Sequence, residues 1–244
     1  MNEYNFKICG NESQFIDISL APSQRIMAEP GAMALMDSAC EMETVLGNGE
    51  EKEGFFGKIM GAGHRVLTGE KLTLVQITSP PTKSTRVVLS APYQGAILPL
   101  DLQEYNGEFI CQKGAYLGGA PGVKISIALQ KKISSGFFGG EGFLLQRLSS
   151  DGLIFIHAGG SLIKHTLDEG ESIVVDTGSV VGFENTVKFN IKFVKGIKNI
   201  IFGQEGITLV ELTGPGCVYA QSMPFNRLAG QILSQLPPSI LESK

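Results

Sequence analysis

Hydrophobic and polar residues alternate along much of the chain, most clearly in residues 123–130 and 187–194. Neighbouring side chains on a strand point to opposite faces, so this alternation predicts strands with one buried face. The apolar positions expected on those faces are Val123, Ile125, Ile127, Leu129, Val187, Phe189, Ile191 and Phe193. Residues 153–156 are apolar throughout, as in a strand buried on both faces. With 31 glycines and 11 prolines supplying turns, the pattern predicts an all-β protein of many short strands.

One segment near the C-terminus has a helical pattern instead. Leu228, Ile232 and Leu236 are spaced to lie on one helical face. Asn226 is a suitable N-cap, and Pro237 follows as a stop. We therefore predict a short C-terminal helix. A second helix is conceivable within residues 55–65, although three glycines there weaken that prediction.

The chain also contains an internal repeat. Residues 114–158 align without gaps on residues 178–222, and 14 of the 45 aligned pairs are identical. A looser third copy begins near Gly31, which matches Gly114 and Gly178, and carries 12 extra residues within 45–66. Self-similarity at a fixed spacing is the signature of a repeated structural unit. The sequence therefore predicts one small β unit used three times.

The repeat divides the chain into four predicted segments. They are unit 1 at residues 1–93 with its insertion near 45–66, unit 2 at 94–158, unit 3 at 159–224, and a helix with a tail at 225–244. Each unit is close to the size at which a core becomes too small to be stable alone. We therefore expect the three units to pack edge to edge.

Composition and charge narrow the functional classes. The formal net charge is −4 without a basic block, which argues against a nucleic-acid partner. The four scattered cysteines lack CxxC spacing and are read as free thiols in a reducing compartment. The N-terminus lacks the pattern of a signal peptide, and no apolar run is long enough to span a membrane. These features predict a cytoplasmic protein without a transmembrane segment.

Four features together resemble one protein family. They are the Gly-Ala-(Met/Tyr) element, the Gly-Phe-Phe-Gly segments at 54–57 and 136–139, the Ala-Pro-Gly turn at 120–122 and the Leu-Thr-Gly-Pro-Gly turn at 212–216. The chain resembles the family of the yeast "altered inheritance of mitochondria" protein 24 over roughly residues 5–225. The resemblance implies three tandem units similar to the tryptophan RNA-binding attenuation protein, each a short double-stranded β-helix. It also implies homotrimers, and it brings no reaction, cofactor or catalytic residue.

Candidate catalytic and metal-binding residues are few. His64, His157 and His165 form no His-x-His pair, and a site made of the last two with Glu169 would need two strands to converge. Gly-rich stretches at 61–63 and 139–142 lack the strand and helix context of a phosphate loop. No Gly-x-Ser-x-Gly nucleophile motif occurs. We expect a protein that is not an enzyme and holds no metal or cofactor, with a cupin-like metal enzyme as the remote alternative.

Repeated lysines raise the possibility of RNA binding. Lys124 aligns with Lys188, and Lys131 with Lys195, but the first copy has Glu41 at the position of Lys124. Phosphate contacts supply most of the affinity for nucleic acids, so an acidic chain is a poor candidate. We expect these lysines to be solvent-facing strand residues.

The most informative candidates are two pairs of adjacent phenylalanines, Phe55-Phe56 and Phe137-Phe138. Neighbours on a strand face opposite ways, so one ring of each pair is either exposed or covered by a partner, unless a bulge turns both inward. We expect Phe55, Phe56, Phe137 and Phe138 to contribute to contacts between units or with an unknown protein. The favoured function is a ring-forming assembly protein, with a small-ligand or RNA-binding module as the alternative.

Overall fold

The computed structural model describes residues 4–46, 73–131, 143–193 and 208–235. These residues form an all-β fold with one α-helix, which confirms the predicted fold class. The strands of the N-terminal third are β1 (Asn5–Cys9), β2 (Phe15–Leu20), β3 (Arg25–Ala28), β4 (Met33–Met36), β5 (Glu41–Leu46), β6 (Thr73–Thr78) and β7 (Thr85–Ser90).

The middle third contains β8 (Gly95–Asp101), the 3-10 helix η1 (Leu102–Tyr105), β9 (Glu108–Gln112), β10 (Tyr116–Gly119), β11 (Lys124–Lys131), β12 (Phe143–Ser149) and β13 (Leu153–Gly159). The last third contains β14 (Leu162–Leu167), β15 (Ser172–Asp176), the 3-10 helix η3 (Thr177–Ser179), β16 (Val180–Glu184), β17 (Lys188–Phe193), β18 (Thr208–Thr213), β19 (Gly216–Gln221) and α2 (Phe225–Ser234).

The same pairing pattern occurs in three successive groups of six strands, β2–β7, β8–β13 and β14–β19. We call them groups 1, 2 and 3. In each group the sixth strand pairs with the first and the third, and the fifth pairs with the second and the fourth. Each group thus supplies two three-stranded half-sheets. All of these pairs are antiparallel.

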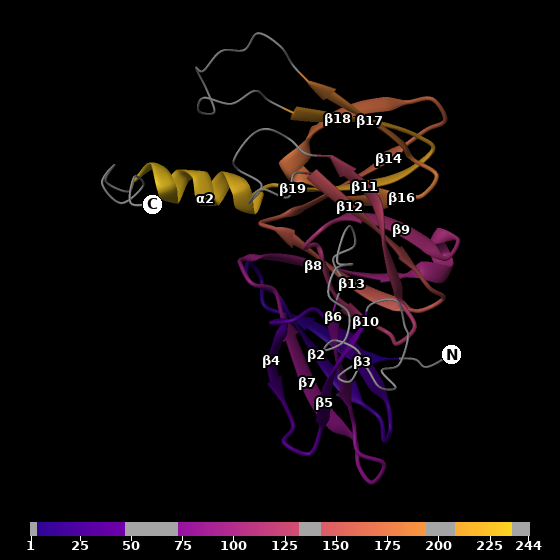
Figure 1. Ribbon diagram of the computed structural model, residues 1–244, viewed down its shortest axis with the longest axis vertical. Coiled ribbons are helices and arrows are strands. Elements are labelled where there is room, and N and C mark those ends of the chain that lie inside the picture. Colours follow the sequence, from indigo (N-terminus) through magenta and orange to yellow (C-terminus); the bar gives the residue numbers. More distant parts are fainter. Residues whose placement is uncertain (1–3, 47–72, 132–142, 194–207, 236–244) are drawn as a thin grey trace, which may run out of the picture.

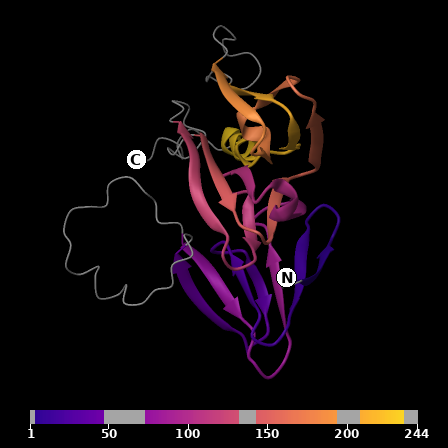
Figure 2. The same ribbon diagram turned by 90° about the vertical axis from the view of Figure 1, so that its right-hand side faces the viewer.

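The groups are joined because half-sheets from neighbouring groups share a ladder. β10 of group 2 pairs with β3 of group 1, and β16 of group 3 pairs with β9 of group 2. These two ladders, which we call the internal junctions, create two six-stranded sheets. Groups 1, 2 and 3 are therefore stacked along the long axis of the molecule (Figures 1 and 2). These ladders join strands from neighbouring predicted units. The predicted unit boundaries themselves stay predictions.

The core forms three clusters, one for each end of the stack and one in the middle. The clusters at the ends include Ile18 and Phe183, and the middle cluster includes Phe109 and Tyr116. As predicted, Ile154, Phe155 and Ile156 are fully buried. Burial of such side chains contributes about 1.5–3 kcal/mol each and is the main stabilising term.

One predicted strand face is wrong in part. Val123 and Ile125 are buried and Leu129 packs against the core, as expected, but Ile127 is exposed. A bulge after Ile127 shifts the register with β12, and Ala128 and Leu129 on the far side of it both pack against the core of group 3. An extra residue in one strand disrupts the alternation at that point.

The C-terminal helix is present, but its predicted N-cap is wrong. The N-cap of α2 is Pro224, without a side-chain bond, and Asn226 lies inside the first turn, where its Oδ1 accepts from the Arg227 amide. The proline backbone adopts the extended conformation that a cap needs. The predicted helix within 55–65 lies outside the described residues. In the described part of the chain no helix is long and apolar enough to cross a membrane.

Candidate functional site

The structure leaves several predicted site residues untested. Phe55, Phe56, Phe137 and Phe138 lie outside the described residues, as do His64, the Gly-rich stretches and the 12-residue insertion. The interface role of the four phenylalanines therefore stays a prediction.

The two described histidines lie in unlike surroundings. His157 in β13 is buried, whereas His165 in β14 is exposed and lies 3.8 Å from Glu171 Oε1. Among the described residues no group of three or more His, Cys, Asp and Glu side chains could hold a metal ion. Of the repeated lysines, Lys124 and Lys188 occupy matching places, because they begin β11 and β17, and Glu41 begins β5; Lys195 lies outside the described residues. The described cysteines are free thiols; Cys40 and Cys111 are buried, and Cys9 and Cys217 are half-buried.

A polar groove of about 490 Å³ lies on group 1, between β1, β2, β7 and the end of β4. Arg86 donates to both carboxylate oxygens of Asp17 at 2.8 Å, and Lys83 lies 3.3 Å from Asp37. The Ala39 amide and then Lys83 hold the pKa of Asp37 below its usual value, and Arg86 does the same for Asp17. Because the charges neutralise one another, the groove has little net attraction for a charged ligand.

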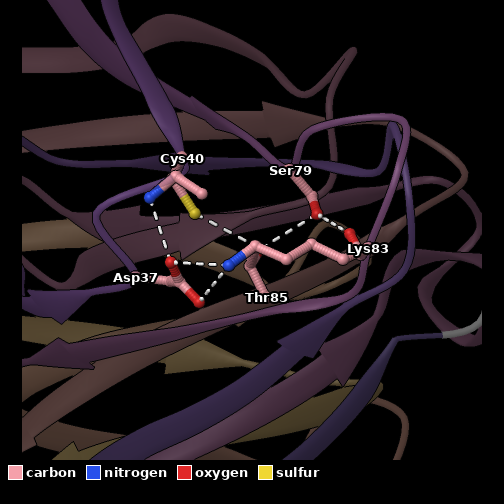
Figure 3. Close-up of polar contacts among 6 residues, drawn as sticks. Asp37, Cys40, Ser79, Lys83 and Thr85 are labelled. Carbon is pink, nitrogen blue, oxygen red and sulfur yellow. Dashed lines mark hydrogen bonds and ion pairs between the residues drawn. The ribbon is translucent and has the colours of Figure 1, made fainter.

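Beneath the groove a chain of hydrogen bonds fixes the neighbouring turns (Figure 3). The buried Cys40 thiol donates to Thr85, the Thr85 hydroxyl donates to Ser79, and the Ser79 hydroxyl donates to the Lys83 carbonyl. These bonds satisfy buried polar groups, which would otherwise destabilise the fold. This row of hydrogen bonds holds the turn after β4 in place through Cys40.

The two internal junctions have the same geometry. Gly118 of β10 lies opposite Ala28, and Gly182 of β16 lies opposite Cys111. One residue further along, Gly119 lies opposite Met27, and Phe183 lies opposite Ile110. Each glycine follows a bulge in the ladder with the sixth strand of its own group.

In the part of the chain that the structure describes, group 1 and group 3 each have one strand without the corresponding partner. β4 corresponds to β10 and β16, and its bulge between Met33 and Leu35 lies at the same place. β15 corresponds to β3 and β9. Among the described residues, β4 pairs only with β7 and β15 pairs only with β18, so each has one unpaired edge. We call these edges the outer β4 edge and the outer β15 edge.

Side chains at the outer edges are exposed where their internal counterparts are buried. Val174 of β15 is 55% exposed, whereas Met27 and Ile110 at the matching positions are 7% and 3% exposed. On the other edge Ala34 is exposed, whereas Leu117 and Val181 are buried. An unpaired strand edge is a template on which a strand of another chain can pair.

The outer edges lie at opposite ends of the molecule. Figure 1 shows β4 at one end of the stack and the sheet of β17 and β18, which also contains β15, at the other. A chain therefore cannot pair its own outer edges. Sequence reasoning missed this site, although the repeat itself contained the signal: three copies in a row leave one unmatched strand at each end.

Comparisons with known proteins agree with this fold. Residues 6–223 match the family model described as mitochondrial biogenesis AIM24. An uncharacterized protein of Streptococcus pyogenes is 27% identical over 229 residues, which cover 92% of this chain and 87% of that protein. A crystal structure of a Streptococcus pyogenes protein is similar with a TM-score of 0.72 and 21% identity, and the match covers 96% of this chain and 100% of the other.

Proposed function

The chain belongs to the mitochondrial biogenesis AIM24 family, and we propose that it is a non-enzymatic assembly protein that forms a ring-like homotrimer. Copies associate head to tail, with the outer β4 edge of one copy on the outer β15 edge of the next. The ring then presents a surface to an unidentified protein partner.

The observation that carries this proposal is the difference in burial at matching positions. Val174 and Ala34 lie at the ends of the stack and are exposed, whereas their counterparts inside it are buried. Covering an apolar side chain contributes about 25 cal/mol per Å² of surface removed from water. A second copy supplies the missing strand in the register that the internal junctions already use.

The internal junctions also predict the register between copies. Leu35 and Met36 correspond to Gly118 and Gly119, and Val175 and Val174 correspond to Ala28 and Met27. We therefore place Leu35 opposite Val175 of the next copy and Met36 opposite Val174. Head-to-tail contacts between like surfaces close into rings or continue as filaments. The family resemblance favours closure at three copies, which gives nine six-stranded groups.

The test is the mass in solution together with one charge substitution. The chain has a mass of 26.1 kDa, so a trimer has a mass of about 78 kDa (3 × 26.1). Val174→Asp places a charge on the outer β15 edge and should yield the monomer. Ile163→Asp is the matched control, because Ile163 is 51% exposed on β14, which belongs to a different sheet from β4 and from β15. A monomeric wild-type chain, or a Val174→Asp variant that still forms the trimer, would contradict the proposal.

The polar groove supports a second candidate function, the binding of a small ligand. It is lined by side chains from several strands and contains both hydrogen-bond donors and acceptors, among them Lys7, Ser19 and Arg86. Native mass spectrometry of the purified protein tests this candidate. A bound molecule that Arg86→Ala releases would support it, and a bare chain mass would argue against it.

A further inference from the structure

We propose that Leu35 makes the contact between copies weaker than the internal junctions, because it stands where both internal junctions have glycine. This inference rests on the proposed ring. It names the residue that determines how readily the ring opens.

The internal junctions depend on glycine for a steric reason. A Cβ atom at Gly118 would lie 2.6 Å from the Met27 carbonyl oxygen, and one at Gly182 would lie 2.6 Å from the Ile110 carbonyl oxygen. Carbon and oxygen atoms do not approach so closely, and both oxygens belong to the main chain of the paired strand. Glycine inside a strand often marks such a close approach of two backbones.

Leu35 occupies the same place in group 1. It follows the bulge in β4 and lies opposite Val88, just as Gly118 lies opposite Phe155 and Gly182 lies opposite Tyr219. In the expected register its Cβ atom meets the Val174 carbonyl oxygen of the next copy. Leu35 is 47% exposed in the single chain, so nothing there opposes its present position.

The junction between copies must therefore be wider than the internal junctions. The strands separate by enough to admit the Cβ atom, which lengthens or breaks main-chain hydrogen bonds of the ladder. The apolar side chains of the two edges still cover one another. Side chains and bulges that hinder an edge are a common means of limiting strand pairing. Here the hindrance leaves a contact that forms and dissociates while the internal junctions stay intact.

A dilution series of three proteins tests this proposal. The dissociation constant of the trimer is measured by sedimentation velocity for the wild type, Leu35→Ala and Leu35→Gly. Alanine is the matched control, because it shortens the side chain and keeps the Cβ atom that causes the clash. Relief of an overpacked contact is worth a factor of about 5 to 150, so Leu35→Gly should bind at least about fivefold more tightly than Leu35→Ala.

The outcomes separate the two proposals. If the wild type forms a ring and Leu35→Gly binds no more tightly than Leu35→Ala, Leu35 is not the limiting residue and the ring stands. If the wild type is a monomer and only Leu35→Gly assembles, Leu35 blocks pairing and the natural ring is wrong. If none of the three assembles, both proposals fall.

A second measurement covers the case in which Leu35→Gly does not fold. Hydrogen exchange is recorded on the assembled wild-type protein, and the amides of β15 are compared with those of β9 at the internal junction. A wider junction predicts faster exchange in β15. Equal protection of the two strands would overturn the proposal without any substitution.

Discussion

His157 gives the sharpest prediction about stability, because its titratable ring is buried in the core. Only 2% of its surface is exposed, and neither ring nitrogen has a partner among the described residues. Its ring contacts Tyr93 edge to face at 4.6 Å between centroids. Burial lowers the pKa of His157 from 6.5 to about 4, and a contact with the Tyr93 main chain offsets only part of that effect.

The repeat explains why the His157 ring has no partner in the part of the chain that the structure describes. Gln221 stands at the matching position of group 3, where it accepts from the Gly159 amide at 2.7 Å and donates to the Gly178 carbonyl at 2.8 Å. Gly159 belongs to group 2 and serves Gln221 of group 3. The matching residue of group 1, which would serve His157 of group 2, is Pro92, and proline has no amide hydrogen. His157 therefore lacks the donor that serves Gln221.

The sign of the pH effect follows from proton binding in the two states. Between pH 6.5 and about 4 the unfolded chain binds a proton at His157 and the folded chain does not. The free energy of unfolding is therefore highest above pH 6.5 and falls as the pH drops towards 4. The difference between the two pKa values corresponds to at most about 3 kcal/mol.

Urea unfolding between pH 4.5 and 7.5, at one protein concentration, measures this effect. His157→Gln and His157→Leu should both remove the His157 share of the pH dependence, and leucine also removes the unsatisfied nitrogens. The control is His165→Gln, which removes an exposed imidazole and should leave the dependence in place. If wild type and both His157 variants lose stability in parallel over this range, the reasoning about burial is wrong.

Two further substitutions test the packing of the groups. Gly118→Ala should lower the free energy of unfolding by about 1–3 kcal/mol in a urea titration, because the new Cβ atom meets the Met27 carbonyl oxygen. Leu35→Ala, at the matching exposed position, should lower it clearly less. Equal losses in the two variants would contradict the steric account. Gln221→Ala should cost about 1–3 kcal/mol by thermal or urea unfolding, because it leaves the buried Gly159 amide unpaired; an unchanged midpoint would mean that water replaces the lost bond.

Local features of the chain were predictable because their causes are local. The alternation at 187–193 predicts β17, and Val187, Phe189 and Ile191 do pack against the core of group 3. The glycine-rich turns and the C-terminal helix follow from the same short-range rules. The alternation at 123–130 did not reveal the bulge between Ile127 and Leu129, because a bulge depends on the partner strand, which a single segment does not show.

The sequence by itself determined that this is an all-β chain with repeated parts, since side-chain alternation and self-similarity are written in the order of residues. Only the tertiary structure decided which strand edges pair, because pairing joins segments such as β3 and β10 that are far apart in the chain. It also decided that His157 is buried and Val174 is exposed. Burial of a side chain depends on the strand that pairs with its own, and among the described residues β4 and β15 have no strand paired with their outer edges.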